Sequence, residues 1–463
     1  MNVVEADYLV VGTGAMGMAF TDVILSETEA SVIMIDRHHQ PGGHWNDAYP
    51  HVRLHQPSAF YGVNSKHLGS DRIDDTGWNK GLYELATNSE VVAYFDQVMQ
   101  HTFLSSGRVQ YFPSCEYLGD GKFESLVSGQ SFSANAKTIV DATYMNVTVP
   151  SIRPPSFKVA NGVACEPPNS LAKIQGQYAD YVVIGAGKTG MDACLFLLNN
   201  KVDPDRIRWI MPRDSWLLDR ADIQPGKLFA ASIGKRAGEQ MEDMALATSV
   251  EDLFDRVEAR GSLLRLDPKV VPTMYRCATV TQAEAKELRR IKNVVRKGRV
   301  TALDPDEIHL EDGSEPTNTQ TLHIDCTADG LQKREETKVF TANHITLQSV
   351  RTCQQVFSAA FIGHIEASYT DEAQKNELCT PVPHPDTDID FLRTALANAL
   401  NGARWAKDPD LQAWLKAARL DGFTMADAPE PDMSDPEVAA QAKKLGELAQ
   451  ASTENLQRLL AEA

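Results

Sequence analysis

Two glycine fingerprints of the same kind constrain this chain more than any other feature of its sequence. The first, GTGAMG, spans residues 12–17 within DYLVVGTGAMGMAF, and the second, GAGKTG, spans residues 185–190 within DYVVIGAGKTGMDA. Each follows an apolar run typical of a buried parallel strand, and each opens a helical pattern. That context separates a dinucleotide site from a chance match. The sequence therefore predicts two Rossmann-like units in one chain.

The glycines of such a turn have separate tasks. The first allows the tight strand-to-helix turn, the second lets the backbone approach a pyrophosphate, and the third lets helix and strand pack closely. The helix N-terminus then offers free N–H groups and a favourable dipole to the anion. Two such turns predict two dinucleotides, and a flavin with a nicotinamide is the usual pair in a redox enzyme. We expect six glycines to bind these cofactors: Gly12, Gly14, Gly17, Gly185, Gly187 and Gly190.

Length and charge narrow the class of protein. The 463 residues have room for two or three domains, and 43% hydrophobic with 23% charged residues fits a globular protein. A net charge of −18 argues against nucleic acid as a partner, because phosphate binding needs a basic excess. No run approaches the roughly 18 apolar residues that span a bilayer, and no cleavable signal precedes the first strand. We expect a cytoplasmic protein with no membrane partner.

The seven cysteines are scattered, and none forms a CxxC pair. We therefore expect small buried hydrophobic residues and no disulfide framework. A flavoprotein that reduces disulfides through its own dithiol needs two cysteines close together, which the spacing does not offer. The three histidines His44, His51 and His55 lie in a loop without a cysteine or acid pair, so we expect no metal site.

The order of predicted elements gives an α/β fold class, with two Rossmann-like units, a helical insertion and a helical C-terminal tail. We expect the first part of an FAD-binding domain over residues 1–155 and a nicotinamide-binding domain over 176–322, inserted in the first. Residues 215–293 lose the alternation of strand and helix and read as a helical insertion. The FAD-binding domain resumes over 323–405, and a helical extension follows over 406–463, where C-terminal helices offer a surface for a homo-oligomer.

Several polar residues lie where cofactor contacts belong. Asp36 follows Gly12 by 24 positions, near the spacing of a carboxylate that binds ribose hydroxyls, although a surface acid at a strand end is the alternative. Arg213, after the second strand of the second unit, favours NADPH because a guanidinium grips a 2′-phosphate, while pairing with Asp214 or Asp219 is the alternative. The remaining candidates beside the two turns are Arg37, Lys188 and Thr189; Lys188 lies either near the pyrophosphate or in solvent.

The loop over residues 40–65 is rich in glycine, proline, histidine and aromatic residues. We expect its Gly43, His44 and Trp45 to contact a cofactor, with Trp45 packing and not reacting. Its polar candidates for the reacting region are Arg53, His55 and Gln56, although a structural role is open for each histidine. Gln348 falls where the FAD-binding domain completes itself, and a cofactor contact and a core position are equally open for it.

The order of these motifs resembles the FAD- and NADPH-dependent flavoprotein monooxygenases, the group of flavin-containing monooxygenases and Baeyer–Villiger enzymes. The similarity covers residues 5 to about 335. GGHW at 42–45 is similar to the family's GGxW turn, YPHVRL at 49–54 to its YPGxRxD stretch, and DAT at 141–143 to its ATG hinge. DCTADG at 325–330 resembles the second hinge. The FxGxxxHxxxY signature that the family carries before its second fingerprint is broken here, with Glu166 at the histidine.

The resemblance implies an FAD-dependent, NADPH-using monooxygenase that reduces its flavin by hydride transfer and activates molecular oxygen to oxygenate a small organic substrate. The broken signature keeps a second class open, an NAD(P)H-dependent flavin oxidoreductase without oxygenation. A third is a non-catalytic dinucleotide-binding redox sensor. No motif in the sequence identifies the substrate.

Overall fold

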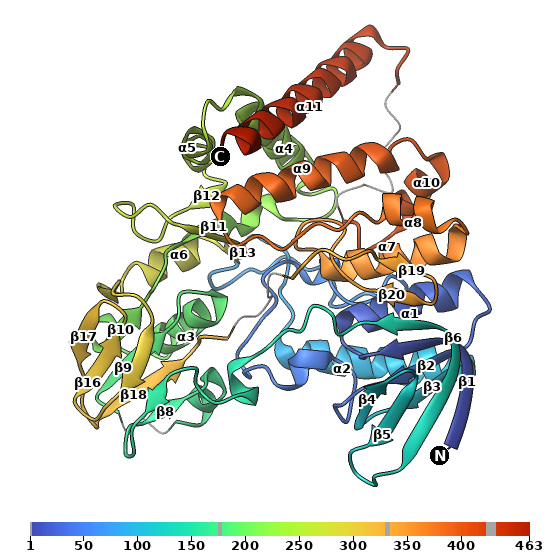
Figure 1. Ribbon diagram of the computed structural model, residues 1–463. Helices are drawn as coiled ribbons and strands as arrows, with labels where there is room; N and C mark the ends of the chain where they lie inside the picture. Colours follow the sequence, from blue (N-terminus) through green and yellow to red (C-terminus); the bar gives the residue numbers. More distant parts are fainter. Residues whose placement is uncertain (1, 175–177, 329–333, 423–431) are drawn as a thin grey trace.

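Figure 1 shows the computed structural model, which describes residues 2–174, 178–328, 334–422 and 432–463. The first unit, coloured mainly blue, lies beside the second, coloured green to yellow, and helices of the C-terminal part lie above both. Within the described residues no helix combines the length and apolar character needed to cross a membrane.

The first unit is built on a largely parallel sheet. Its strands run in the order β19-β20-β6-β1-β2-β3, and β1 (Asn2–Val11) lies parallel to both β6 (Ser131–Asp141) and β2 (Val32–Ile35). The buried apolar half of β1 ends at Val11, Gly12 follows it directly, and α1 (Ala15–Glu27) begins three residues after Gly12. The outer elements are β3 (Val109–Phe112), β4 (Cys115–Gly119), β5 (Lys122–Ser125), β19 (Phe340–Thr341), β20 (His344–Thr346) and α2 (Asn88–Val98).

The second unit repeats this plan between the two parts of the first. Its parallel sheet has the order β14-β10-β9-β18-β8. The strands are β8 (Cys165–Glu166), β9 (Asp180–Ile184), β10 (Ile207–Ile210), β14 (Asn293–Val295) and β18 (Thr321–Asp325), and α3 (Lys188–Asn199) follows β9. A small sheet formed by β7 (Lys158–Val159), β15 (Val300–Leu303), β16 (Glu307–Leu310) and β17 (Gly313–Pro316) lies beside it. The predicted α/β class with two Rossmann-like units, one inserted in the other, is confirmed.

The segment 215–293 differs from the expected helical insertion because it also contains strands. A third sheet joins β11 (Ser215–Asp219), β12 (Leu263–Leu264) and β13 (Met274–Val280), and the helices are α4 (Ala230–Leu246), α5 (Val250–Ala259) and α6 (Gln282–Leu288). β12 has only two residues, and β11 and β13 are buried along most of their length, so their sequences do not alternate between apolar and polar residues. Their pairing is decided by tertiary packing around Trp216, Phe254 and Tyr275.

The C-terminal part joins the two units. α7 (Gln355–Ser368) packs against α1 of the first unit, and α9 (Asp388–Trp405) packs against β13 of the second. α8 (Glu372–Leu378), α10 (Pro409–Ala417) and α11 (Pro436–Glu462) complete it. α11 ends beside α4 (Figure 1), where Leu456 and Leu459 are buried and Asn455 donates to the carbonyls of Met244 and Ala247. The last turns of this helix are therefore covered by the same chain.

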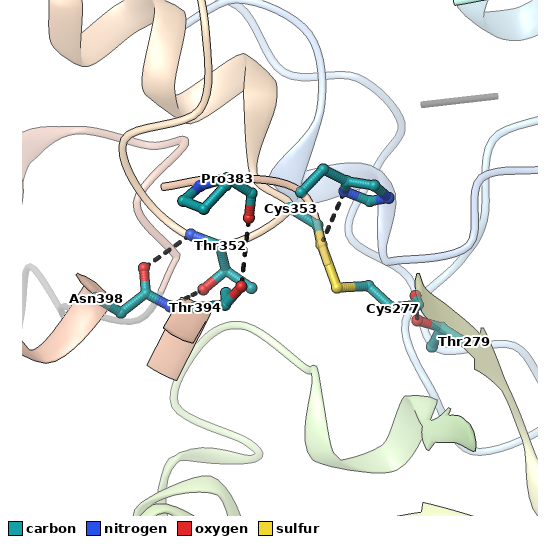
Figure 2. The surroundings of a disulfide bond; sticks show 8 residues. Cys277, Thr279, Thr352, Cys353, Pro383, Thr394 and Asn398 are labelled. Carbon is teal, nitrogen blue, oxygen red and sulfur yellow. Dashed lines mark hydrogen bonds between the residues drawn. A yellow bond between two sulfur atoms is a disulfide. The ribbon is translucent and has the colours of Figure 1, made fainter. Parts of the chain in front are cut away.

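A disulfide crosses from the second unit to the C-terminal part. Figure 2 shows Cys277 on β13 bonded to Cys353 in the loop before α7. The Nδ1 of His384 lies 3.7 Å from the Cys353 sulfur. The expectation that the cysteines form no disulfide is wrong for this pair. The two residues are 76 positions apart, so spacing alone gave no sign of them. Cys115, Cys194, Cys326 and Cys379 are buried free cysteines, as expected.

Candidate dinucleotide-binding site

The two glycine turns occupy equivalent places in their units. The Gly12 N–H donates to the carbonyl of Ile35 at the end of β2, and the Gly185 N–H donates to the carbonyl of Ile210 at the end of β10. The turns that follow β6 and β18 are also alike. The Thr143 N–H and hydroxyl donate to Asp141, and those of Thr327 donate to Asp325. Each glycine turn thus lies at the carboxyl edge of its sheet, the ligand-binding edge of this architecture. Asp329 and Gly330 of the second hinge motif lie outside the described residues.

The first and third glycines leave no room for a side chain. Gly12 and Gly185 have φ of +99° and +123°, a region that L-residues rarely adopt. A Cβ on Gly17 would collide with the carbonyl oxygen of Gly12, and one on Gly190 with that of Gly185. Around the middle glycine, Gly187, no atom lies within 4 Å of the Cβ position. The second turn therefore has an open cradle, shaped for close approach of a phosphate to the backbone.

The helices that follow both turns begin without a side-chain cap. Gly14 and Gly187 are the N-cap residues of α1 and α3, neither start has a capping side-chain hydrogen bond, and neither first turn contains an acid. Their first N–H groups have no intrahelical acceptor, so a pyrophosphate is a suitable partner for them. The glycine turns and the uncapped helix starts that follow them are together suited to bind a dinucleotide at each turn.

Asp36, the proposed ribose acid, is held at the first turn. It is 6% exposed, and its Oδ2 accepts from the N–H and hydroxyl of Thr13 at 2.6 and 2.9 Å. Its Oδ1 accepts from the His38 N–H at 2.8 Å and contacts the His38 ring. Burial opposes the charged form, but the hydrogen bonds from His38 and Thr13 outweigh it, and the pKa of Asp36 is lowered. The carboxylate is therefore fixed in its charged form beside Gly12.

The equivalent position in the second unit is Met211. Its N–H donates to the carbonyl of Val295, as that of Asp36 donates to Phe112, and its side chain is buried. Two residues on, Arg213 forms an ion pair with Asp386, at 3.1 Å between Nη1 and Oδ2. The partner of Arg213 is thus neither Asp214 nor Asp219, the pairings that the sequence left open. Asp214 instead accepts both guanidinium hydrogen bonds of Arg296.

The loop of residues 43–51 touches both turns. Gly43 lies against Gly14, so close that a Cβ on Gly43 would come within 2.9 Å of the Gly14 Cα. Six residues later the Tyr49 hydroxyl donates to Asp192 on α3 at 2.7 Å. One short loop therefore connects the starts of α1 and α3.

Lys188, at the start of α3, forms an ion pair with Asp192 one turn further along the helix. Its side chain is 12% exposed, so it is not the solvated lysine of one interpretation, and its contact with a pyrophosphate stays a prediction. Because Asp192 also accepts from Tyr49, this carboxylate joins the second turn to the loop.

The aromatic and histidine side chains of this loop are packed and uncharged. Trp45 donates to the Tyr61 hydroxyl at 2.6 Å, and its ring stacks with His44. The His51 ring lies 4.1 Å from the Phe196 ring of α3, and both of its nitrogens are buried without a hydrogen-bond partner among the described residues. Burial lowers the pKa of His44 and of His51 to about 4, and that of His55 well below its usual value. All three are neutral at physiological pH.

Arg220, which the sequence analysis did not single out, binds the chain just after this loop. Arg220 is 1% exposed, and its Nε donates to the His55 carbonyl at 2.8 Å. It also donates to the Asn79 side chain and pairs with Glu284 at 2.9 Å. The guanidinium thus ties the loop of the first unit to α6 of the second. A buried arginine with three partners from distant segments leaves no local signal in sequence.

The structure does not bring all candidates together. Arg53 is exposed and donates to the Leu85 carbonyl at 3.2 Å, and Arg37 is exposed beside Asp36. Gln56 is half-buried next to His55. Gln348 is buried and donates to the Thr337 carbonyl at 2.9 Å. These four residues stay predictions, and the contacts observed for Arg53 and Gln348 are made with the backbone of their own chain.

Two parallel sheets with glycine turns at their carboxyl edges define a protein with two nucleotide-binding units. No protein-family model matches the chain. Uncharacterized proteins of Mycobacterium tuberculosis and Mycobacterium bovis are 56% identical to it over 417 residues, which are 90% of this chain and 78% of each relative. The chain therefore belongs to the same protein family as these mycobacterial proteins.

Solved structures that are similar to the chain include flavin monooxygenases. The closed crystal structure of cyclohexanone monooxygenase gives a TM-score of 0.49 at 14% identity, over 98% of this chain and 99% of the other. The cyclohexanone monooxygenase of Rhodococcus sp. Phi1 bound to NADP+ gives 0.49 at 15%, over 100% and 98%. The flavin-containing monooxygenase of Stenotrophomonas maltophilia gives 0.43 at 14%, over 82% and 100%. At this similarity, the chemistry of the chain must follow from its own residues.

Proposed function

We propose that the chain is a flavin-dependent monooxygenase that binds FAD at the first glycine turn and NADPH at the second. One observation carries the proposal: Gly43 lies against Gly14 while Tyr49, in the same loop, contacts Asp192 at the second turn. Two phosphate cradles that share one loop bring two dinucleotides to neighbouring edges. The motif order that resembles flavoprotein monooxygenases supports the same pair of cofactors.

In this proposal the residues of the first unit bind the FAD and fix its orientation. The uncapped start of α1 receives the pyrophosphate, and Asp36, held by Thr13 and His38, accepts from ribose hydroxyls. The start of α3 does the same for the second nucleotide. When bound, FAD supplies the two-electron and oxygen chemistry, and NADPH supplies the reducing equivalents.

In this proposal the histidine and tyrosine side chains of the loop between the turns keep water from the cofactors and stay uncharged. His44 and His51 are neutral because burial holds their pKa values near 4, and Tyr49 stays protonated because burial and the Asp192 charge raise its pKa. Side chains that do not gain or lose protons near neutral pH protect a reactive intermediate from unwanted proton transfer. The substrate in this proposal is a small organic molecule with an oxidisable nitrogen, sulfur or carbonyl carbon.

An anaerobic titration tests the proposal. NADPH is added to the purified holoprotein while its visible spectrum is recorded, and air is then admitted with and without candidate substrates. We expect bleaching of the flavin spectrum, reoxidation by oxygen, and oxygenated product in step with the NADPH consumed. A protein that contains no flavin, or that releases only hydrogen peroxide with every substrate class, contradicts the proposal.

The disulfide favours a second candidate, an NAD(P)H-dependent oxidoreductase without oxygenation. Cys353 comes just before α7, in the chain that continues from the carboxyl end of β20, and Cys277 comes from the second unit. Structure thus brings together two cysteines that are far apart in sequence. In this candidate NAD(P)H and a proton convert the disulfide to two thiols and leave NAD(P)+. Anaerobic NADPH followed by thiol counting separates the candidates: two new thiols per chain favour this one, and none favours the monooxygenase.

A further inference from the structure

The carboxyl edge of the second unit carries two arginines that converge on one carboxylate. Arg213 follows β10, and Arg276 lies on β13. Arg213 Nη1 lies 3.1 Å from Asp386 Oδ2, and Arg276 Nε lies 2.5 Å from Asp386 Oδ1. Each guanidinium therefore holds a different oxygen of the same acid, an arrangement that suits a multivalent anion such as a phosphate.

Asp386 reaches this edge from a distant part of the chain. It lies two residues before α9, and its backbone carbonyl accepts from the Tyr275 N–H at 3.1 Å. The second arm of Arg213 donates to the Thr273 carbonyl at 2.6 Å, which fixes the direction of its guanidinium. Burial opposes the charge on Asp386, but hydrogen bonds from Arg276 and Arg213 outweigh it and lower its pKa. The carboxylate is thus charged and well placed between the two arginines.

The three side chains remain within reach of solvent. Their exposed fractions are 34% for Arg213, 35% for Arg276 and 25% for Asp386. Met211, the position equivalent to the ribose acid of the first unit, offers no hydrogen-bonding group. Recognition of the ribose end of a nucleotide at this unit therefore falls to the neighbouring Arg213.

We propose that Asp386 is a specificity-determining residue, an internal anion that occupies the Arg213–Arg276 site and competes with the 2′-phosphate of NADPH. This inference rests on the proposed function, because it assumes that the second turn binds a nicotinamide dinucleotide. A nucleotide without the 2′-phosphate leaves the three side chains as they are. A nucleotide with it must displace Asp386 from both arginines, so Asp386 weakens the preference for NADPH over NADH.

The test measures binding of two probes, 2′,5′-ADP and 5′-ADP, to the full-length protein by calorimetry. In Asp386→Asn we expect at least tenfold tighter binding of 2′,5′-ADP and less than a twofold change for 5′-ADP. Asp386→Glu keeps the carboxylate and should keep the wild-type ratio. Glu287→Gln, which removes an acid from an exposed pair with Arg290, is the charge-matched control and should change neither affinity.

Thermal unfolding of each variant checks that the fold is retained, and Asp386→Ser replaces Asp386→Asn if the latter is destabilised. Equal strengthening of both probes, or no strengthening of 2′,5′-ADP, overturns the inference and leaves the proposed function standing. If neither probe binds the wild type or any variant, the dinucleotide site at the second turn fails, and this inference fails with it.

Discussion

The two nucleotide-binding units share a backbone plan and differ in the side chain that follows their second strand. In the first unit this is Asp36, an acid fixed by Thr13 and His38 at the turn itself. In the second it is the buried Met211, and the charged group is Arg213, held by Asp386 from the C-terminal part. The first unit thus holds its acid with residues of its own turn, whereas the second holds Arg213 with a segment 173 residues away. In the proposed sites, one cradle is preformed for its ligand, and the other has a carboxylate that competes.

The largest expected effect is the loss of a whole cofactor, and it tests whether both turns are true cradles. Gly17→Ala and Gly190→Ala each place a Cβ against the carbonyl oxygen of the first glycine of the same turn, so helix and strand must separate. We expect about 1–3 kcal/mol less unfolding free energy for each. Gly17→Ala should lose FAD, and Gly190→Ala should keep FAD and lose the nicotinamide nucleotide. Flavin absorbance and calorimetric titration measure these outcomes.

The matched control for both variants is Gly234→Ala, within α4, where no atom lies within 4 Å of the Cβ position. Alanine there should add about 0.5–1 kcal/mol of stability, since glycine is a poor residue inside a helix. Wild-type stability and cofactor content in Gly17→Ala would falsify the cradle geometry of the first turn.

The next effect tests how far the second unit depends on the C-terminal part. Cys353→Ser removes the cross-link to Cys277, and we expect a loss of about 2–4 kcal/mol because the unfolded chain regains freedom over a long loop. Denaturant unfolding under oxidising conditions measures it, and dithiothreitol should lower the wild type to the same value. Cys165→Ser, at a half-buried free cysteine, is the control. Equal loss in both variants contradicts the cross-link.

A third prediction concerns low pH, which should lower the unfolding free energy through the histidines of the loop between the units. His44 lies against Trp45 in the first unit and His51 against Phe196 in the second, and burial lowers both pKa values to about 4. Between pH 6.5 and 4 the unfolded chain binds protons that the folded chain does not. The stabilisation is therefore complete above pH 6.5 and is lost progressively as the pH falls to 4.

We expect this loss to reach about 2 kcal/mol per histidine, after allowance for their partial exposure. Unfolding free energies measured across pH 4–8 test it. The variants His44→Phe and His51→Phe should each reduce the change in unfolding free energy across this pH range by the contribution of one histidine. A wild-type profile that is already flat across this window contradicts the burial of both rings in the folded state.

The smallest effect sharpens the difference between Asp36 and Met211. Asp36→Asn should weaken FAD binding about tenfold, or about 1.4 kcal/mol, because the ribose loses a charged acceptor. Met211→Leu, the conservative change at the equivalent position, should leave nucleotide affinity at the second turn unchanged. Equilibrium dialysis measures both. An unchanged FAD affinity in Asp36→Asn shows that the acid serves Thr13 and His38 alone.

Local chemistry made much of this protein predictable. Strand, glycine turn and helix are neighbours in sequence, so the two units, Asp36 and the loop over 40–65 follow from residues that lie close together. The DxT turns at Asp141–Thr143 and Asp325–Thr327 are also local, and the repeat was visible in the sequence. The mixed structure of 215–293 was missed because β12 is too short to show a period and because β11 and β13, buried along most of their length, do not alternate; their pairing depends on packing around Trp216.

The sequence by itself determined that two glycine turns would each follow a buried strand and open a helix, because backbone sterics and hydrophobic runs act over a few residues. Only the tertiary structure decided which distant groups meet there: Asp386 with Arg213, Tyr49 with Asp192, and Cys277 with Cys353. These pairs are 173, 143 and 76 positions apart. The sequence offers many other charged groups, hydroxyls and thiols that could pair with Arg213, Asp192 or Cys277. The packing of whole helices and strands decides which of them become the partners.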